Sequence, residues 1–278
     1  MGYPVFEKAQ GRVLNIAHRG ARSIAPENTL AAARKAVGCH ADMWELDVSM
    51  TADDQLVVVH DAALLRTSNA KDRFPARRPW RVFDLTREEL CSLDFGSWFL
   101  RRDPFGCIAA GEVSEEDLAA YAGEQAPTLE SALRFTKEHD WLVNVEIKDL
   151  TRAPGDSRVV EKTVAMIREM GMTESVVISS FNHAYLERSR RAAPEIAVGA
   201  LVGTHRSDPL ALMSKLGAQS YHPRADRIRP EEIALLRREG FEVLAWVANE
   251  EKDMRALIAA GVSGIFTDFP QRMHRVTG

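Results

Sequence analysis

Short apolar runs recur along the 278-residue chain, and segments with helical spacing separate them. Eight runs have the length of buried strands, in the order VLNIA, MWELDV, WLVNVEI, VVIS, IAVGAL, QSYH, EVLAWV and GIFT. Between them lie amphipathic segments such as NTLAAARKAV, TLESALRFTKEH and PEEIALLRREG. Strict alternation favours a parallel sheet, and eight repeats favour its closure into an α/β (β/α)8 TIM barrel over an open doubly wound sheet. Neither of the two common phosphate-binding motifs, GxGxxG and GxxxxGK, is present, which weakens the nucleotide-binding alternative.

One passage breaks this alternation. Residues 69–126, which follow the second strand region, are rich in Pro, Gly and charged side chains. A structureless loop of this length is uncommon in a compact domain, so we expect a small inserted subdomain over one mouth of the barrel, covering the substrate. The prediction is a single TIM-barrel domain over residues 1–278 with an insertion at approximately 69–126.

Composition and charge exclude several classes of protein. The net charge is −4, and no basic cluster is long enough to predict a nucleic-acid or membrane footprint. No apolar run approaches the roughly 20 residues of a membrane span, and the start of the chain lacks the pattern of a signal peptide. The 3 cysteines form no CxxC pair, which indicates reduced thiols. A cytoplasmic enzyme is favoured, and no motif indicates its oligomeric state.

Two of the strand-like runs carry acids where a buried strand would have apolar residues. Because side chains alternate along a strand, Glu45 and Asp47 in WELDV share one face, and Glu146 and Lys148 in VNVEIKD share another. Active sites of such barrels form at the carboxyl ends of the strands, so the three acids are expected to converge there. A divalent cation would relieve their repulsion, and oxygen ligands point to Mg²⁺ or Ca²⁺. The alternative is a buried salt-bridge network with Lys148 and Arg19.

Two histidines follow neighbouring runs. His18 comes after VLNIA and His60 after LVVV, so both are expected at the same mouth of the barrel as the acids. Imidazole titrates near neutral pH, and two histidines beside a carboxylate cluster suit a general acid and base pair. Arg19 adds a fork of donors suited to a phosphate. Together these groups predict phosphoryl chemistry.

Residues 17–69 closely resemble the glycerophosphodiester phosphodiesterase family, with the motifs HRG, PENT, ExD and HD in that order. The resemblance continues through FGSWF, PTLESAL, NVEIK, SSFN, AWVAN and GIFTDFP, and so covers most of the chain. It implies a TIM barrel with an insertion that hydrolyses glycerophosphodiesters, such as glycerophosphocholine or glycerophosphoethanolamine, to sn-glycerol 3-phosphate and an alcohol. The motif positions imply His18 and His60 as the acid and base pair, Glu45, Asp47 and Glu146 as metal ligands, and Arg19 and Lys148 as phosphate contacts.

The resemblance leaves two points of mechanism open, namely which histidine is the acid, and whether the nucleophile is water or the glycerol 2-hydroxyl. Phe181 in SSFN and Trp246 in AWVAN stand at strand ends, where family members use aromatics to line the substrate entrance. Core packing is an equal alternative for both.

Several polar residues near these motifs have two readings. Asn28 in PENT is placed to cap the following helix, with Glu27 as a partner of the site residues. Asp61 and Asp268 are placed either to hold the histidines or a hydroxyl, or to cap helices. Two further histidines, His183 and His222, belong to no zinc-binding spacing. We therefore expect both to be loop residues with satisfied hydrogen bonds.

Two other functions compete with this prediction. The sphingomyelinase D type of barrel shares the paired histidines and acids, acts on choline phospholipids and lacks a large insertion, so residues 69–126 argue against it. A binding protein that has lost catalysis would be expected to lack at least one of the two histidines or three acids. All five are present.

Overall fold

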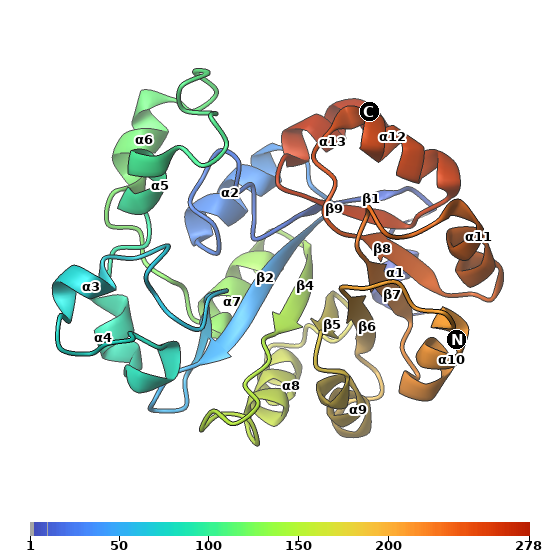
Figure 1. Cartoon of the computed structure of the whole chain (residues 1–278), viewed down its shortest axis with the longest axis horizontal. Helices are drawn as coiled ribbons and strands as arrows, with labels where there is room; N and C mark the ends of the chain where they lie inside the picture. Colours follow the sequence, from blue (N-terminus) through green and yellow to red (C-terminus); the bar gives the residue numbers. More distant parts are fainter. Residues whose placement is uncertain (1–2, 10) are drawn as a thin grey trace.

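Eight parallel strands close into a barrel in the computed structural model, which describes residues 3–9 and 11–278 (Figure 1). The strands are β1 Leu14–Ala17, β2 Met43–Met50, β4 Leu142–Ile147, β5 Val176–Ser180, β6 Ala197–Val202, β7 Ser220–Pro223, β8 Glu242–Ala245 and β9 Gly264–Thr267. Because β1 pairs with both β2 and β9, the ring of eight parallel strands is closed. The predicted TIM barrel is confirmed, and residues 1, 2 and 10 of the domain predicted over 1–278 lie outside the description.

Helices follow the strands and surround the barrel (Figure 1). Those of the barrel are α2 Leu30–Gly38, α7 Leu129–Glu138, α8 Val159–Glu169, α9 His183–Ala192, α10 Pro209–Leu216, α11 Pro230–Arg238, α12 Glu251–Ala260 and α13 Pro270–Thr277. Their apolar faces bury against the outward side chains of the strands, as on α7, where Leu129 and Leu133 are fully buried. Thr128 caps α7 by accepting a hydrogen bond from the backbone N–H of Ser131.

The two faces of β2 have opposite characters. Trp44 and Leu46 point outward into the apolar layer under the helices, and each is fully buried. Removing one such large side chain from water contributes roughly 1.5–3 kcal/mol. Glu45 and Asp47 point into the barrel instead, as strand alternation predicts. An antiparallel partner, β3 Leu56–Val58, folds back on the end of β2 and returns the chain to the carboxyl mouth.

Apolar side chains fill the amino end of the barrel interior. Ile16, Met43, Leu142 and Leu244 belong to one buried cluster there, together with Val5 of the short helix α1 Pro4–Glu7. This packing closes the amino end. The polar interior residues therefore lie toward the carboxyl ends of the strands.

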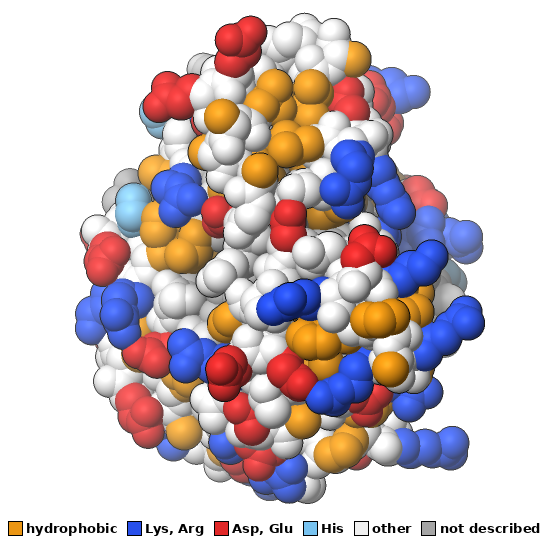
Figure 2. All heavy atoms as spheres, turned by 90° about the vertical axis from the view of Figure 1, so that its left-hand side faces the viewer, with side chains coloured by type: hydrophobic (Ala, Val, Ile, Leu, Met, Phe, Trp, Pro, Cys, Tyr) orange, Lys and Arg blue, Asp and Glu red, His pale blue; other side chains and the backbone are white. Residues whose placement is uncertain are grey.

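The segment between β3 and β4 forms a separate group of short helices beside the barrel (Figure 1). They are α3 Ala70–Arg73, the 3-10 helix η1 Val82–Asp84, α4 Arg87–Cys91, α5 Ser97–Arg102 and α6 Glu115–Tyr121. The first part packs Trp80, Leu85 and Leu90 in a small cluster that it shares with Val57 and Val59 at β3. The second part packs Trp98 and Phe99 of α5 in a cluster with the start of α2. On the face that Figure 2 shows, Lys/Arg and Asp/Glu side chains are interspersed, with apolar groups between them.

Candidate active site

A cavity of about 130 Å³ at the carboxyl ends of the strands collects the predicted residues. Among the described residues it is lined by His18, Arg19, Glu45, His60, Asn144, Glu146, Lys148, Phe181, Leu201, Trp246, Val247 and Phe266. Every residue predicted for the site except Asp47 is in this lining, and Asp47 is fully buried on the same face of β2 as Glu45. Residues 69–126 do not contribute to the lining. The prediction that the insertion covers the substrate therefore finds no support in the cavity walls.

Glu45, Asp47 and Glu146 form a compact acidic cluster in which one carboxylate oxygen of each lies within 4.8 Å of the others. The pairing of Asp47 with Glu146 across β2 and β4 sets this geometry. Burial raises the pKa of Glu45 well above its usual range, and the charges of Asp47 and Glu146 add to the effect. Burial and the charge of Asp47 also raise the pKa of Glu146.

Two cations face the cluster. Nζ of Lys148 lies 2.6 Å from Oε1 of Glu146 and 3.2 Å from Oδ1 of Asp47. Nε of Arg19 lies 3.2 Å from Oδ2 of Asp47. Burial would raise the pKa of Asp47, but the charges of Lys148 and Arg19 outweigh it and hold that pKa far below its usual range. The salt-bridge network considered from the sequence is therefore present in part.

This network leaves acceptors unused. Among the described residues, Oε1 of Glu45 is buried without a hydrogen-bond donor, and Oδ1 of Asp47 makes no hydrogen bond although Nζ of Lys148 lies 3.2 Å away. Such oxygens are costly unless a cation or a donor reaches them. A donor set made of carboxylate oxygens matches Mg²⁺ or Ca²⁺ rather than zinc, so these three acids fit a hard divalent cation.

The turn that carries His18 and Arg19 depends on glycine. Arg19 has a φ of 57°, and its backbone N–H donates to Oε2 of Glu45 at 2.8 Å. Gly20 follows with a φ of +81°, and a Cβ at this position would stand 2.6 Å from Cβ of Ala32 on α2. The HRG motif therefore places Arg19 against the acids by a close approach of the turn to α2.

Each histidine is held by a carboxylate. Nδ1 of His18 lies 2.7 Å from Oδ1 of Asp268, and Nδ1 of His60 lies 2.6 Å from Oδ1 of Asp61. Burial lowers the pKa of His18 to about 4, with a further contribution from the charge of Arg19. Of the two readings from the sequence, the carboxylates hold the histidines. In this arrangement Nε2 of each ring is the nitrogen left for the cavity.

The interpretation of Asn28 as a helix cap is wrong. The cap of α2 is Thr29, whose side chain accepts a hydrogen bond from the backbone N–H of Ala32. Asn28 has a φ of 58°, a conformation that Asn tolerates, and its amide donates to Oδ2 of Asp47 at 2.8 Å. Oδ1 of Asn28 also accepts the backbone N–H of Asp47 at 3.2 Å. The residue therefore positions an acid of the cluster.

The two predicted aromatics meet at the cavity mouth. The rings of Phe181 and Trp246 are 5.4 Å apart and nearly perpendicular. Phe181 is 45% exposed, which does not fit core packing. Trp246 is half-buried and its Nε1 donates to the carbonyl oxygen of His222 at 2.9 Å.

The two remaining histidines differ from each other. His183 is satisfied as expected, because its Nε2 lies 3.0 Å from the carbonyl oxygen of Leu201. The expectation of a loop position is wrong for both, because His183 is the first residue of α9 and because β7 contains the fully buried His222. Its Nε2 lies 2.8 Å from Oγ of Ser220 inside the barrel. Burial lowers the pKa of His222 to about 3.

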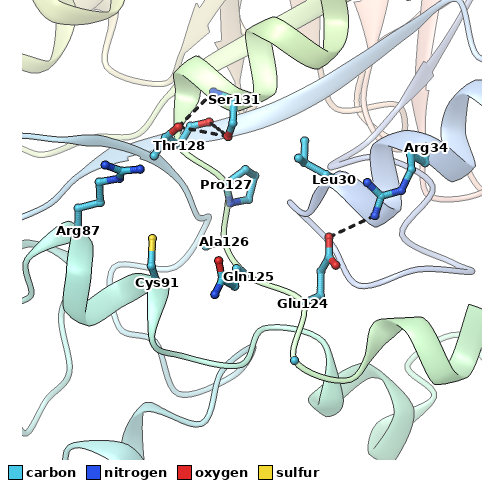
Figure 3. A pocket seen from close by; sticks show the side chains of 11 residues that line it. Leu30, Arg34, Arg87, Cys91, Glu124, Gln125, Ala126, Pro127, Thr128 and Ser131 are labelled. Carbon is cyan, nitrogen blue, oxygen red and sulfur yellow. Dashed lines mark hydrogen bonds and ion pairs between the residues drawn. The ribbon is translucent and has the colours of Figure 1, made fainter.

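A larger cavity of about 480 Å³ lies where the insertion meets α2 and α7 (Figure 3). Arg34, which is 3.6 Å from Glu124, lies on one side of it and Arg87 on the other. Its lining contains a single acid and no histidine. The larger cavity therefore lacks the grouped acids and bases that mark the site at the strand ends.

The barrel and the site at its carboxyl end define an enzyme of the phosphodiesterase class. The sequence profile of the glycerophosphoryl diester phosphodiesterase family matches residues 18–272. The chain belongs to this family.

Known proteins are similar in sequence and in structure to nearly the whole length of this chain. A glycerophosphodiester phosphodiesterase of Caldanaerobacter subterraneus subsp. tengcongensis is 35% identical over 263 residues, which are 94% of this chain and 96% of the relative. A crystal structure of a Silicibacter pomeroyi protein has a TM-score of 0.82 at 26% identity and covers 99% of this chain and 97% of its own. The structure of an Oleispira antarctica phosphodiesterase in complex with the product sn-glycerol-3-phosphate has a TM-score of 0.77 at 26% identity, with 95% and 96% covered. None of the described helices of the present chain is both long and apolar enough to cross a membrane.

Proposed function

We propose that the enzyme catalyses metal-dependent hydrolysis of glycerophosphodiesters to sn-glycerol 3-phosphate and an alcohol. Glycerophosphocholine and glycerophosphoethanolamine are the first substrates to consider. The observation that carries the proposal is the acidic cluster of Glu45, Asp47 and Glu146 at the cavity that also holds two carboxylate-bound histidines. The product named for the Oleispira antarctica structure supports it.

Arg19 and Lys148 are the groups proposed to bind the nonbridging oxygens of the phosphate. Both line the cavity, and both are already oriented by acids of the cluster. Such charge-assisted contacts are strong in a site with little water. Arg19 offers a planar fork of donors, whereas Lys148 acts as a point charge.

Glu45, Asp47 and Glu146 are the residues proposed to hold the cation, with Mg²⁺ and Ca²⁺ as candidates. When bound, a divalent cation would offset the negative charge that builds on the phosphate oxygens during displacement. Asn28 and Lys148 keep the carboxylate of Asp47 in place for this task.

His18 and His60 are proposed as the general acid and base. One histidine takes a proton from the nucleophile, water or the glycerol 2-hydroxyl, as its oxygen bonds to phosphorus. With the 2-hydroxyl the first product is a cyclic phosphate, which a water molecule opens in a second step to give sn-glycerol 3-phosphate. The bond from phosphorus to the alcohol oxygen breaks, and the other histidine donates a proton to that oxygen. Asp268 and Asp61 hold Nδ1 of the two rings, so Nε2 of each ring carries out the transfer.

The substrate enters past Phe181 and Trp246, which we propose as walls for the glycerol or the alcohol portion. We also propose to treat residues 69–126 as one inserted unit of a single domain. The series of short helices from α3 to α6 supports this division. The partner of the site is a small molecule rather than a nucleic acid.

The test is release of glycerol 3-phosphate from a panel of glycerophosphodiesters by protein stripped with a chelator and resupplied with Mg²⁺, Ca²⁺ or Mn²⁺. Release restored by one of the metals supports both the reaction and the cofactor, and the panel ranks the alcohols. Undiminished release from the stripped protein would overturn the metal requirement. Absence of release with every metal, from folded protein, would overturn the substrate class.

A further inference from the structure

Glu27 is a buried carboxylate on which three arginines converge. Its side chain is 2% exposed. Arg19 donates to its Oε1 at 2.8 Å, and Arg22 donates to its Oε2 at 2.8 Å. Arg66 reaches both oxygens, at 2.6 Å and 2.8 Å. Together these four residues form what we call the Glu27 network.

Two arginines of the Glu27 network also contact the carboxylates that hold the histidines. Nε of Arg66 donates to Oδ2 of Asp61 at 2.7 Å, and Asp61 holds His60. The other guanidinium, that of Arg22, lies 3.5 Å from Oδ1 of Asp268. An unbroken series of contacts therefore runs from His60 to the carboxylate that holds His18, with Glu27 at its centre.

The residues of this series come from separate parts of the barrel. His18 follows β1, Glu27 precedes α2, and His60 follows β3. No backbone hydrogen bond joins the described His60 segment to the turn after β1. Pairing of β1 and of β3 with β2 places the two strand ends, and side-chain contacts are left to set how the two imidazole rings lie. Charged contacts in a half-buried site have the directionality to do so.

The insertion packs against the same two arginines. The guanidinium of Arg66 lies over the ring of Trp98 at 5.8 Å, and that of Arg22 lies over the ring of Phe105 at 5.2 Å. Trp98 belongs to α5 and is 5% exposed. Aromatic faces attract and orient such cations. The insertion therefore supports the Glu27 network instead of lining the cavity.

We propose that Glu27, Arg22 and Arg66 are positioning residues that fix the geometry of the general acid and the general base relative to each other, with Trp98 as their support from the insertion. The proposal rests on the proposed function of His18 and His60. It assigns a task to the insertion and to three residues that do not touch the reacting atoms.

Two substrates that share a glycerophosphoryl group distinguish a defect in the general acid from a defect in the general base. One has an alkyl alcohol as the leaving group, whose oxygen needs a proton as the bond to phosphorus breaks. The other has 4-nitrophenol, which departs as the phenolate without one. Weaker positioning of the acid therefore slows the alkyl substrate alone, whereas weaker positioning of the base slows both.

The variants are Arg66→Met on the His60 side and Arg22→Met on the His18 side, with Arg168→Met as the control. Arg168 forms an exposed ion pair with Glu195 on the barrel surface. We expect one site variant to lose about tenfold or more in kcat on the alkyl diester with a much smaller loss on the 4-nitrophenyl diester. The other site variant should lose similar factors on both, and KM should change little in each.

A purely structural role gives a different result. Loss of folded enzyme lowers kcat by one common factor for both substrates in both variants, and this outcome, or unchanged kcat, would overturn the proposal. Trp98→Leu should reproduce the Arg66→Met pattern with a smaller amplitude. Wild-type protein that cleaves neither diester would contradict the proposed function itself, which keeps the two failures distinguishable.

Discussion

Nδ1 of His18 lies 2.7 Å from Oδ1 of Asp268, a residue 250 positions further along the chain. The parallel pairing of β1 with β9, in which Ala17 is opposite Thr267, brings the two together. Burial would raise the pKa of Asp268, but the hydrogen bond and charge of His18 and the charge of Arg22 lower it to about 2. The carboxylate is thus ionised at neutral pH and fixes the orientation of the ring.

This contact predicts that Asp268→Asn reduces kcat by about 10- to 100-fold while the protein stays folded, because an amide no longer favours the proton on Nδ1. Steady-state kinetics with a glycerophosphodiester and a thermal melt of the same sample provide the check. Asp253→Asn, on the exposed side of α12, is the matched control. Wild-type turnover in Asp268→Asn would show that the ring does not need this partner.

A second prediction concerns the acidic cluster. Burial and the neighbouring charges raise the pKa of Glu45, so its ionised form is unfavourable in the metal-free protein. Mg²⁺ or Ca²⁺ should raise the melting temperature of stripped wild-type protein by roughly 5 °C at saturation. The Glu45→Gln variant should lose this rise and melt no lower than wild type in chelator.

The control for the acidic cluster is Glu130→Gln. Glu130 is exposed on α7 and pairs only with Arg134 four residues on, among the described residues. It should keep the full metal-dependent rise. Equal stabilisation of Glu45→Gln and wild type by the metal would remove Glu45 from the ligand set.

A third prediction is that the free energy of unfolding decreases at acidic pH because of His222 on β7. The pKa of His222 is lowered to about 3 by burial, whereas the ordinary value is 6.5. Between these pH values His222 binds a proton in the unfolded chain but not in the folded protein. Its contribution to stability is therefore fully present above pH 6.5 and decreases as the pH falls toward 3. Each pH unit costs about 1.4 kcal/mol at most.

Urea unfolding at pH 7 and pH 5 tests this dependence. The difference in unfolding free energy between the two pH values should be smaller in His222→Gln than in wild type, although the variant is less stable at both. A residual difference is expected, because His18 has a pKa of about 4 and contributes with the same sign. If this difference were the same in His222→Gln and wild type, folding would not lower the pKa of His222.

The barrel could be predicted because alternation of apolar runs and amphipathic segments depends on local periodicity alone. The acids of WELDV were placed on one face by the same alternation, and both lie inside the barrel. The histidines could be placed because they directly follow strands. Each of these inferences needed only short stretches of sequence.

Contacts between distant residues could not be predicted in this way. Asn28 was interpreted as a helix cap from its position before α2, yet its amide reaches Asp47 on β2. No local pattern distinguishes Arg22 and Arg66 from surface arginines, and only the fold brings both to Glu27. Hydrogen bonds between side chains 5 and 39 positions apart in the sequence produce no periodic pattern, so only the three-dimensional structure reveals them.

The last prediction concerns the turn of the HRG motif. Gly20→Ala should destabilise the protein for two reasons, since a φ of +81° is unfavourable for Ala and the added Cβ would stand 2.6 Å from Cβ of Ala32. Gly240→Ala isolates the first reason, because Gly240 has a φ of +85° and nothing lies within 4 Å of an added Cβ. We expect roughly 1 kcal/mol of destabilisation for Gly240→Ala and at least about 2 kcal/mol more for Gly20→Ala. The extra loss should be accompanied by lower kcat, because the turn must shift away from α2 and Arg19 donates its backbone N–H to Glu45. Equal destabilisation of the two variants in urea, with full activity in Gly20→Ala, would mean that the turn can move without disturbing the acids.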